Sequence, residues 1–111
     1  MLFGRTEATT WATCFQALGD PSRILILHLL ATSGRPLTVG EITDALDIGQ
    51  SMVSHHLKKL ADVRFVLVDH DRNSSFYRVN GECLTRFPTA AQLVMGKVPA
   101  GFVAPTGGRT R

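Results

Sequence analysis

Residues 37–62, LTVGEITDALDIGQSMVSHHLKKLAD, contain two short helical patterns joined by a tight turn. Thr38 and Glu41 have the spacing of a capping box, in which each side chain binds the backbone N–H of the other residue. Leu37 and Ile42 have the spacing of the hydrophobic staple that accompanies such a cap. The first helix of the pair is therefore expected to begin at this cap and to end before the turn.

The second helix of the pair, expected over residues 50–62, has two chemically different sides. At 100° per residue its apolar side chains fall on one side, and the opposite side between residues 50 and 59 has no carboxylate. Hydroxyl, amide, imidazole and ammonium groups there can bind base edges in a major groove or neutralise phosphates. The alternative is an ordinary solvated polar face. The candidates for base or nearby phosphate contact are Gln50, Ser51, Ser54, His55 and Lys58, and those for backbone phosphate contact at the shoulder of the helix are His56 and Lys59.

A period-two pattern follows the helix pair. Residues 65–70 and 75–79 have strand character, and residues 71–74 between them are turn formers, so we expect a β-hairpin. Arg72 and Asn73 at its tip are candidates for contact with a phosphate or with the minor groove. The alternative is a plain hairpin turn, in which such residues are common.

Two further helices are expected before the pair and one after the hairpin. Apolar residues recur at helical spacing over residues 7–18, and Asp20 and Pro21 then have the types favoured at the N-cap and the first position of a helix. That second helix is apolar nearly all round, which predicts a buried central helix. A last helical pattern covers residues 82–95 and is interrupted by Pro88. The expected fold is mainly α with a β-hairpin wing, a winged helix-turn-helix.

The 111 residues are enough for one domain, and 44% apolar with 19% charged residues is typical of a globular protein. The net charge is +3, but three of the twelve basic residues lie in residues 97–111, so residues 1–96 are neutral overall. We expect a domain over residues 1–96 and a flexible basic tail over residues 97–111. Any DNA binding must then come from charge segregated onto one face. The sequence has neither a secretory signal nor an apolar stretch of membrane-spanning length, so we expect a cytoplasmic protein.

Residues 15–80 resemble the ArsR/SmtB family of bacterial metal- and redox-responsive repressors. The resemblance rests on residues 17–23 (ALGDPSR), 37–42 (LTVGEI), 50–60 (QSMVSHHLKKL) and 76–79 (FYRV). It implies a homodimer joined through the first and last helices, which presents two recognition helices to a near-palindromic operator about one DNA turn, roughly 34 Å, apart. The sequence departs from the family pattern at Gly49, where a Ser cap is usual, and at Arg64, where a Gly usually follows the recognition helix.

The resemblance also implies release of DNA on metal binding or cysteine oxidation. The third helix has no Cys or His, and residues 82–96 have no His, so both familiar metal sites of the family are missing. A non-standard site for a transition metal ion such as nickel or zinc, or a redox pair of thiols, stays open. Its candidate residues are Cys14, Cys83, His28 and His70. The alternatives are two cysteines buried as small hydrophobes and, for His28, a core or interface histidine.

Two other classes of function are weighed against a DNA-binding regulator. A winged-helix protein-interaction module, or a co-regulator without its own operator specificity, would explain the neutral body and the acidic wing. A thiol enzyme would use Cys14 or Cys83, but neither has a neighbouring His in the sequence, and a domain of this size has little room for a deep pocket. We therefore expect a regulator and no enzyme.

Overall fold

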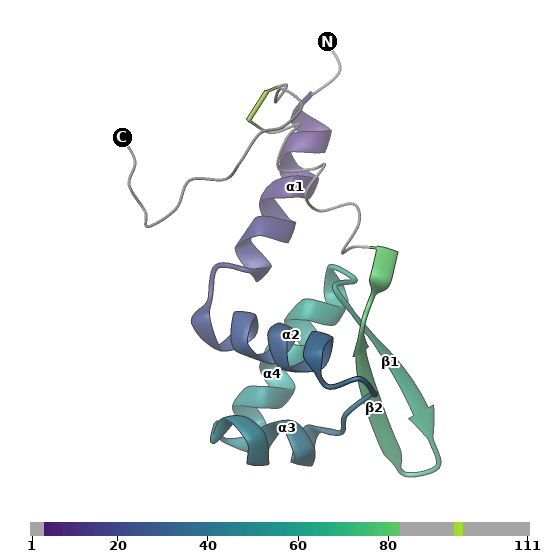
Figure 1. Ribbon diagram of the computed structural model, residues 1–111. Coiled ribbons are helices and arrows are strands. Elements are labelled where there is room, and N and C mark those ends of the chain that lie inside the picture. The colour runs from purple at the N-terminus through teal and green to yellow at the C-terminus, as the bar shows by residue number, and fades with distance from the viewer. Residues whose placement is uncertain (1–3, 83–94, 97–111) are drawn as a thin grey trace.

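The computed structural model describes residues 4–82 and 95–96 of the chain (Figure 1). These residues form the expected helices and hairpin in the expected order, so the winged helix-turn-helix is confirmed. The elements are α1 (Arg5–Ala17), α2 (Pro21–Thr32), α3 (Val39–Leu46), α4 (Gln50–Asp62), β1 (Val66–Asp71) and β2 (Ser74–Val79). The expected last helix, over residues 82–95, lies almost entirely outside the described residues, as does the tail over residues 97–111.

Side-chain caps fix the starts of α2 and α3. Asp20 accepts hydrogen bonds from the backbone N–H groups of Ser22 at 2.8 Å and Arg23 at 3.3 Å. At α3, the Thr38 hydroxyl accepts from the N–H of Glu41 at 3.2 Å, and the Glu41 carboxylate accepts from the N–H of Thr38 at 2.9 Å. Both caps satisfy N–H groups that a helix start otherwise leaves without partners, and both were predicted from the sequence.

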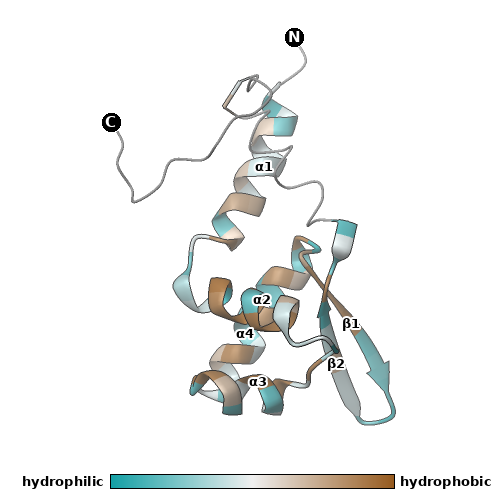
Figure 2. Cartoon of the chain, in the orientation of Figure 1, coloured by the Kyte–Doolittle hydropathy of each residue, from teal (hydrophilic) through white to brown (hydrophobic). Residues whose placement is uncertain are grey.

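The core lies between α2, α3, α4 and the base of the hairpin, and Figure 2 shows that the tip of the hairpin is hydrophilic. Full burial of an aliphatic side chain contributes about 1.5–3 kcal/mol, so these contacts hold the three helices together. The largest fully buried side chains are Ile26, Ile42, Leu57, Leu60, Val53 and Val66.

Helix α2 is buried on one side only, which corrects the expectation of a helix buried all round. Ile26 and Leu30 are in the core, but Ile24 and Leu25 are 51% and 52% exposed. The expectation was wrong because an apolar pattern all round a helix does not show which sides of the helix other elements of the fold cover. Helix α1 extends away from this layer (Figure 1), and only Ala17 in its last turn is buried.

The hairpin is fastened to the helix-turn-helix at its base. Leu37, just before α3, forms an isolated bridge with Tyr77 of β2, with N–H···O distances of 3.0 and 2.8 Å. At the other end, the register pairs Asp71 with Ser74, so the turn has two residues, and Arg72 adopts a φ of 60°. A positive φ at this position is what two-residue hairpins require, usually from Gly or Asn.

Helix α4 ends in a Schellman motif. The N–H of Phe65 binds the carbonyl of Leu60 and the N–H of Arg64 binds the carbonyl of Ala61, both at 3.0 Å. Arg64 has a φ of 65°, a left-handed conformation in which glycine is free of Cβ strain. The arginine therefore occupies a glycine conformation, as the family resemblance implied.

Within the described part of the chain, no helix combines the length and the hydrophobicity that crossing a bilayer requires.

Candidate nucleic-acid interface

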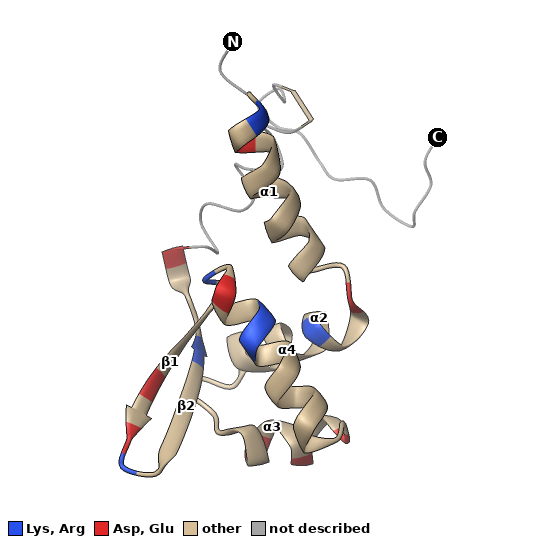
Figure 3. Ribbon diagram, turned by 180° about the vertical axis from the view of Figure 1, so that it is seen from behind, with Lys and Arg blue, Asp and Glu red and all other residues tan. Residues whose placement is uncertain are grey.

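The outer side of α4 is exposed over its whole length, as predicted. The residues on it are Gln50, Ser51, Ser54, His55, Lys58 and Lys59, and all six are exposed. Figure 3 shows the basic residues of this helix, which are lysines, on its later part, and the nearest acid on α4 is Asp62, whose carboxylate lies 3.7 Å from the Lys58 ammonium. The exposure of the six residues is therefore confirmed, and their contact with DNA stays a prediction.

The first turn of α4 favours an anion. Its N-cap is Gly49, which provides no side-chain hydrogen bond, and the first turn has no acidic residue. Backbone N–H groups and the positive end of the helix dipole therefore act at the surface beside Gln50 and Ser51. The same end of a recognition helix is the end that usually approaches DNA bases.

His56 does not lie on this surface, which corrects the prediction that it meets a phosphate. The residue is 4% exposed and its ring is inside the protein against Arg23 of α2. Its position three residues after Val53 and four before Leu60 puts it on the core side of the helix. This spacing could have shown from the sequence that His56 lies on the core side. The residue was placed on the surface because its side chain is polar.

Met52 is a surface residue that the sequence interpretation missed. It lies in the first turn of α4 and is 49% exposed, although methionine is usually buried. An apolar side chain at the start of a recognition helix can contact the methyl group of thymine. Its place between polar neighbours on the helix, away from Val53 and Leu57, is the signal that could have identified it.

The wing presents Arg72 and Asn73 at its exposed tip, as expected. Part of the acidity of the wing is neutralised within the hairpin, because Nε of Arg78 lies 3.0 Å from the Asp69 carboxylate. A shallow cavity of about 300 Å³ separates Asn73 from the start of α3. The wing tip can therefore offer one guanidinium and one amide next to the helix-turn-helix.

The acid nearest the start of α3 is also neutralised. The Arg35 guanidinium binds the Glu41 carboxylate at 3.0 Å. This hydrogen bond, together with the N–H of Thr38, holds the pKa of Glu41 below its usual value. Asp44 on α3 and Asp47, its C-cap, are exposed. Phosphates would therefore meet the start of α3 with less repulsion than its end.

Comparison with known proteins identifies the family. The family described as "Bacterial regulatory protein, arsR family" matches residues 20–67, the segment from the cap of α2 into β1. An arsenical resistance operon repressor of Staphylococcus xylosus is 33% identical over 73 residues, which are 66% of this chain and 68% of that protein. The chain belongs to the ArsR family. An uncharacterised HTH-type transcriptional regulator of Methanocaldococcus jannaschii is 38% identical over 68 residues, which are 61% of this chain and 75% of that regulator.

A solved structure agrees with this assignment. The homodimeric winged helix-turn-helix DNA-binding domain of a possible ArsR-family transcriptional regulator from Mycobacterium bovis, determined by NMR, superimposes with a TM-score of 0.66. The two sequences are 27% identical, and the match covers 86% of this chain and 88% of that domain. The ArsR-family chain therefore shares its fold with a DNA-binding domain that is itself homodimeric.

The described residues of the ArsR-family chain bring together no group of three or more metal-ligating side chains. Of the candidate ligands, Cys14 is half-buried on α1, and His28 is exposed on α2, so His28 is not in the core. His70 is on the wing, where its Nδ1 lies 2.9 Å from the Ser75 hydroxyl. Cys83 lies outside the described residues. The three described candidates are on three different elements.

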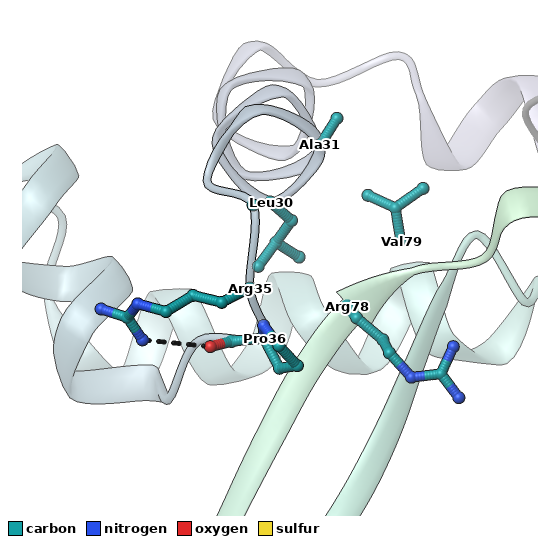
Figure 4. A pocket seen from close by; sticks show the side chains of 7 residues that line it. Leu30, Ala31, Arg35, Pro36, Arg78 and Val79 are labelled. Carbon is teal, nitrogen blue, oxygen red and sulfur yellow. Dashed lines mark hydrogen bonds between the residues drawn. The ribbon is translucent and has the colours of Figure 1, made fainter.

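A cavity of about 270 Å³ lies between the end of α2 and the base of β2 (Figure 4). Its walls include Leu30, Pro36 and Val79, and the stems of Arg35 and Arg78. Both guanidinium groups are already paired with carboxylates, those of Glu41 and Asp69 respectively. Among its described lining residues, the cavity of the ArsR-family chain is therefore largely apolar, and both of its arginines are paired.

Proposed function

We propose that this ArsR-family chain is a DNA-binding transcriptional regulator that represses its target by occupying an operator. The observation that carries the proposal is the exposed side of α4, which has hydroxyl, amide, imidazole and ammonium groups and no carboxylate from Gln50 to Lys59. A similar protein is named as an arsenical resistance operon repressor. Acting on an operator would place the protein in the cytoplasm. A family of transcriptional regulators also agrees with the expectation that the chain is not an enzyme.

The operator-binding form is a homodimer in this proposal. Helix α1 has most of its surface uncovered, and Ile24 and Leu25 of α2 add apolar area that the single chain leaves exposed. The similar DNA-binding domain from Mycobacterium bovis is homodimeric. A twofold dimer presents two copies of α4 to successive major grooves of a near-palindromic site, about 34 Å apart.

Base contacts are assigned to the first turns of α4 and phosphate contacts to the cations around them. Gln50, Ser51, Ser54 and His55 read base edges, and Met52 contacts a thymine methyl group. Lys58, Lys59 and Arg72 neutralise phosphates, and Asn73 contacts the backbone from the wing. His56 has no part in this contact because it is buried.

The signal that the regulator senses is a separate proposal. A site containing Cys14 and Cys83 would suit a soft metal ion or a reversible disulfide. A nickel or zinc site would also need His28 or His70, which lie on other elements than Cys14, in the same or a second subunit. Titrating the dimer on DNA with nickel, zinc, arsenite and a persulfide donor tests this, with Cys14→Ser as the comparison. A compound that releases DNA from the wild type but not from the Cys14→Ser variant supports a site at Cys14. Release that is unaffected by the variant excludes Cys14.

The salt dependence of DNA affinity tests the proposed function. The probe is a 30-bp duplex selected by the protein from a random library, and its dissociation constant is measured by fluorescence anisotropy between about 50 and 300 mM salt. Three cations per subunit make about six phosphate contacts in the dimer. The logarithm of the association constant, the inverse of the measured dissociation constant, should therefore fall with the logarithm of the salt concentration with a slope of about −5.

Lys59→Ala should lower the magnitude of this slope by about 2, because one cation is lost from each subunit. The matched control is Arg5→Ala, which removes an exposed positive charge at the far end of α1 and should leave the slope unchanged. A flat salt response, or no binding at low salt, would favour the alternative of a protein-interaction module or co-regulator.

A further inference from the structure

A polar cluster with one buried and two half-buried side chains joins three helices behind the exposed side of α4. Its members are His56 of α4, Arg23 of α2 and Asp20, the N-cap of α2. Nη1 of Arg23 lies 3.2 Å from Nδ1 of His56. The same guanidinium donates from Nε to the carbonyl of Ala17 at 2.6 Å and from Nη2 to the carbonyl of Gln16 at 3.4 Å. One side chain therefore ties the end of α1 to the recognition helix.

The contact defines the protonation state of His56. A guanidinium only donates hydrogen bonds, so Nδ1 of His56 must accept and cannot carry a proton. The neutral ring then has its proton on Nε2, which faces the Asp20 carboxylate with Nε2 and Oδ1 4.0 Å apart. Asp20 is itself held by the backbone N–H groups of Ser22 and Arg23. Both ring nitrogens thus face groups whose positions are fixed.

Arg23 lies between the end of α1 and α4. A cavity of about 210 Å³ lies between their last turns, with Thr13 and Gln16 on one side and Lys59 and Asp62 on the other. Arg23 lines this cavity and spans the gap. The hydrogen bonds of the Arg23 guanidinium therefore contribute, together with the apolar core, to the orientation of α4 relative to α1.

We propose that Arg23 and His56 are positioning residues that hold the recognition helix to the α1–α2 junction, and that tight operator binding requires this contact. The inference rests on the proposed function, since it concerns how α4 is presented to DNA. If α1 also joins the two subunits, the contact sets the angle between the two recognition helices. We call it the Arg23–His56 link.

The link should break when His56 is protonated, because the new proton on Nδ1 would face a guanidinium. Burial lowers the pKa of His56, the charges of Arg23 and His55 lower it further, and only Asp20 opposes them. The neutral ring therefore belongs to the folded state. The stability from this group is complete above its ordinary pKa of 6.5 and is lost progressively as the pH falls below that value.

Two substitutions separate the link from simple packing. His56→Asn keeps an acceptor at the place of Nδ1 but does not titrate, whereas His56→Gln places its amide near Nε2 and leaves Arg23 without that acceptor. At about pH 8 we expect the Asn variant to bind the selected duplex within about threefold of the wild type, and the Gln variant to bind at least about tenfold more weakly.

The pH profile gives a readout that packing alone does not produce. Between about pH 8 and pH 5.5 the wild type should lose more affinity than His56→Asn, by a factor that stays below about ten because the pKa of folded His56 lies below 6.5. His55 is present in both proteins, so its contribution to DNA binding cancels in this comparison. The profile uses only the wild type and the conservative variant, and it therefore stands even if His56→Gln fails to fold.

Imidazole ¹⁵N NMR of the free protein tests the link without DNA. At about pH 8 the spectrum should show His56 with an unprotonated Nδ1 and a protonated Nε2. A protonated Nδ1, parallel pH profiles of wild type and His56→Asn, or equal affinities of folded Asn and Gln variants would each overturn the link. Absence of DNA binding by the wild type at pH 8 would instead overturn the proposed function.

Discussion

Replacing both Ser54 and His55 by alanine removes two polar groups from the centre of the proposed reading surface. Both side chains are exposed, and in the described part of the chain neither has a hydrogen bond in the free protein. Each lost hydrogen bond to a base costs about 1 kcal/mol, so two per recognition helix and two helices per dimer give about 4 kcal/mol. At 1.4 kcal/mol per tenfold, specific affinity should fall about 10³-fold.

The assay compares the selected duplex with a scrambled duplex of the same composition by fluorescence anisotropy. Binding to the scrambled duplex should change less than about threefold, because no cation is removed. The melting temperature should stay within about 3 °C, since surface substitutions change stability by at most about 0.5 kcal/mol. His28→Ala is the matched control, because His28 is also exposed but lies on α2. Full specific affinity in the double variant would refute the assignment of this surface.

The two left-handed arginines give further predictions. Arg64→Gly should stabilise the protein by about 1 kcal/mol, or about 4 °C in melting temperature, because glycine adopts the φ of 65° without Cβ strain. Arg64→Ala keeps the strain and should give no such gain; equal effects of Gly and Ala would contradict the strain argument. Arg72→Gly should stabilise the hairpin by about 1 kcal/mol in the same way and also reduce the salt slope by about 2, whereas Arg72→Lys should leave the slope unchanged. An unchanged slope in the glycine variant would remove the wing from the DNA contact.

Local signals in the sequence were sufficient for the framework of the fold. The cap at Asp20 and the capping box of Thr38 and Glu41 each depend on a few neighbouring residues. Their geometry is dictated by backbone hydrogen bonds that have few alternatives. The starts of α2 and α3 could therefore be predicted without knowledge of the tertiary structure. The glycine-like position of Arg64 was implied only by the family resemblance.

Assignments that depend on the environment of a side chain were less successful. His56 was expected at the surface because it is polar, but an arginine 33 residues earlier in the chain provides it with a buried partner. Ile24 and Leu25 were expected in the core, yet only one side of α2 faces this chain. In both cases the missing information was which distant part of the fold lies against the residue.

In the candidate site, too, local spacing could be predicted from the sequence and the surroundings of a side chain could not. The exposed residues of α4 followed from helical spacing, because the core side is marked by Val53, Leu57 and Leu60. Met52 was overlooked since hydrophobicity alone assigns methionine to the interior. The part each side chain plays on DNA depends on the docking angle of α4, which the sequence of one chain does not contain.

Backbone-amide chemical shifts of the protein, recorded while the selected duplex is added, test the proposed reading surface most directly. We predict that the largest changes fall on Gln50, Ser51, Ser54 and His55, with a second group at Arg72 and Asn73. Amides on the exposed side of α2 should change little. Changes concentrated on α2, with α4 unaffected, would contradict DNA binding through the recognition helix.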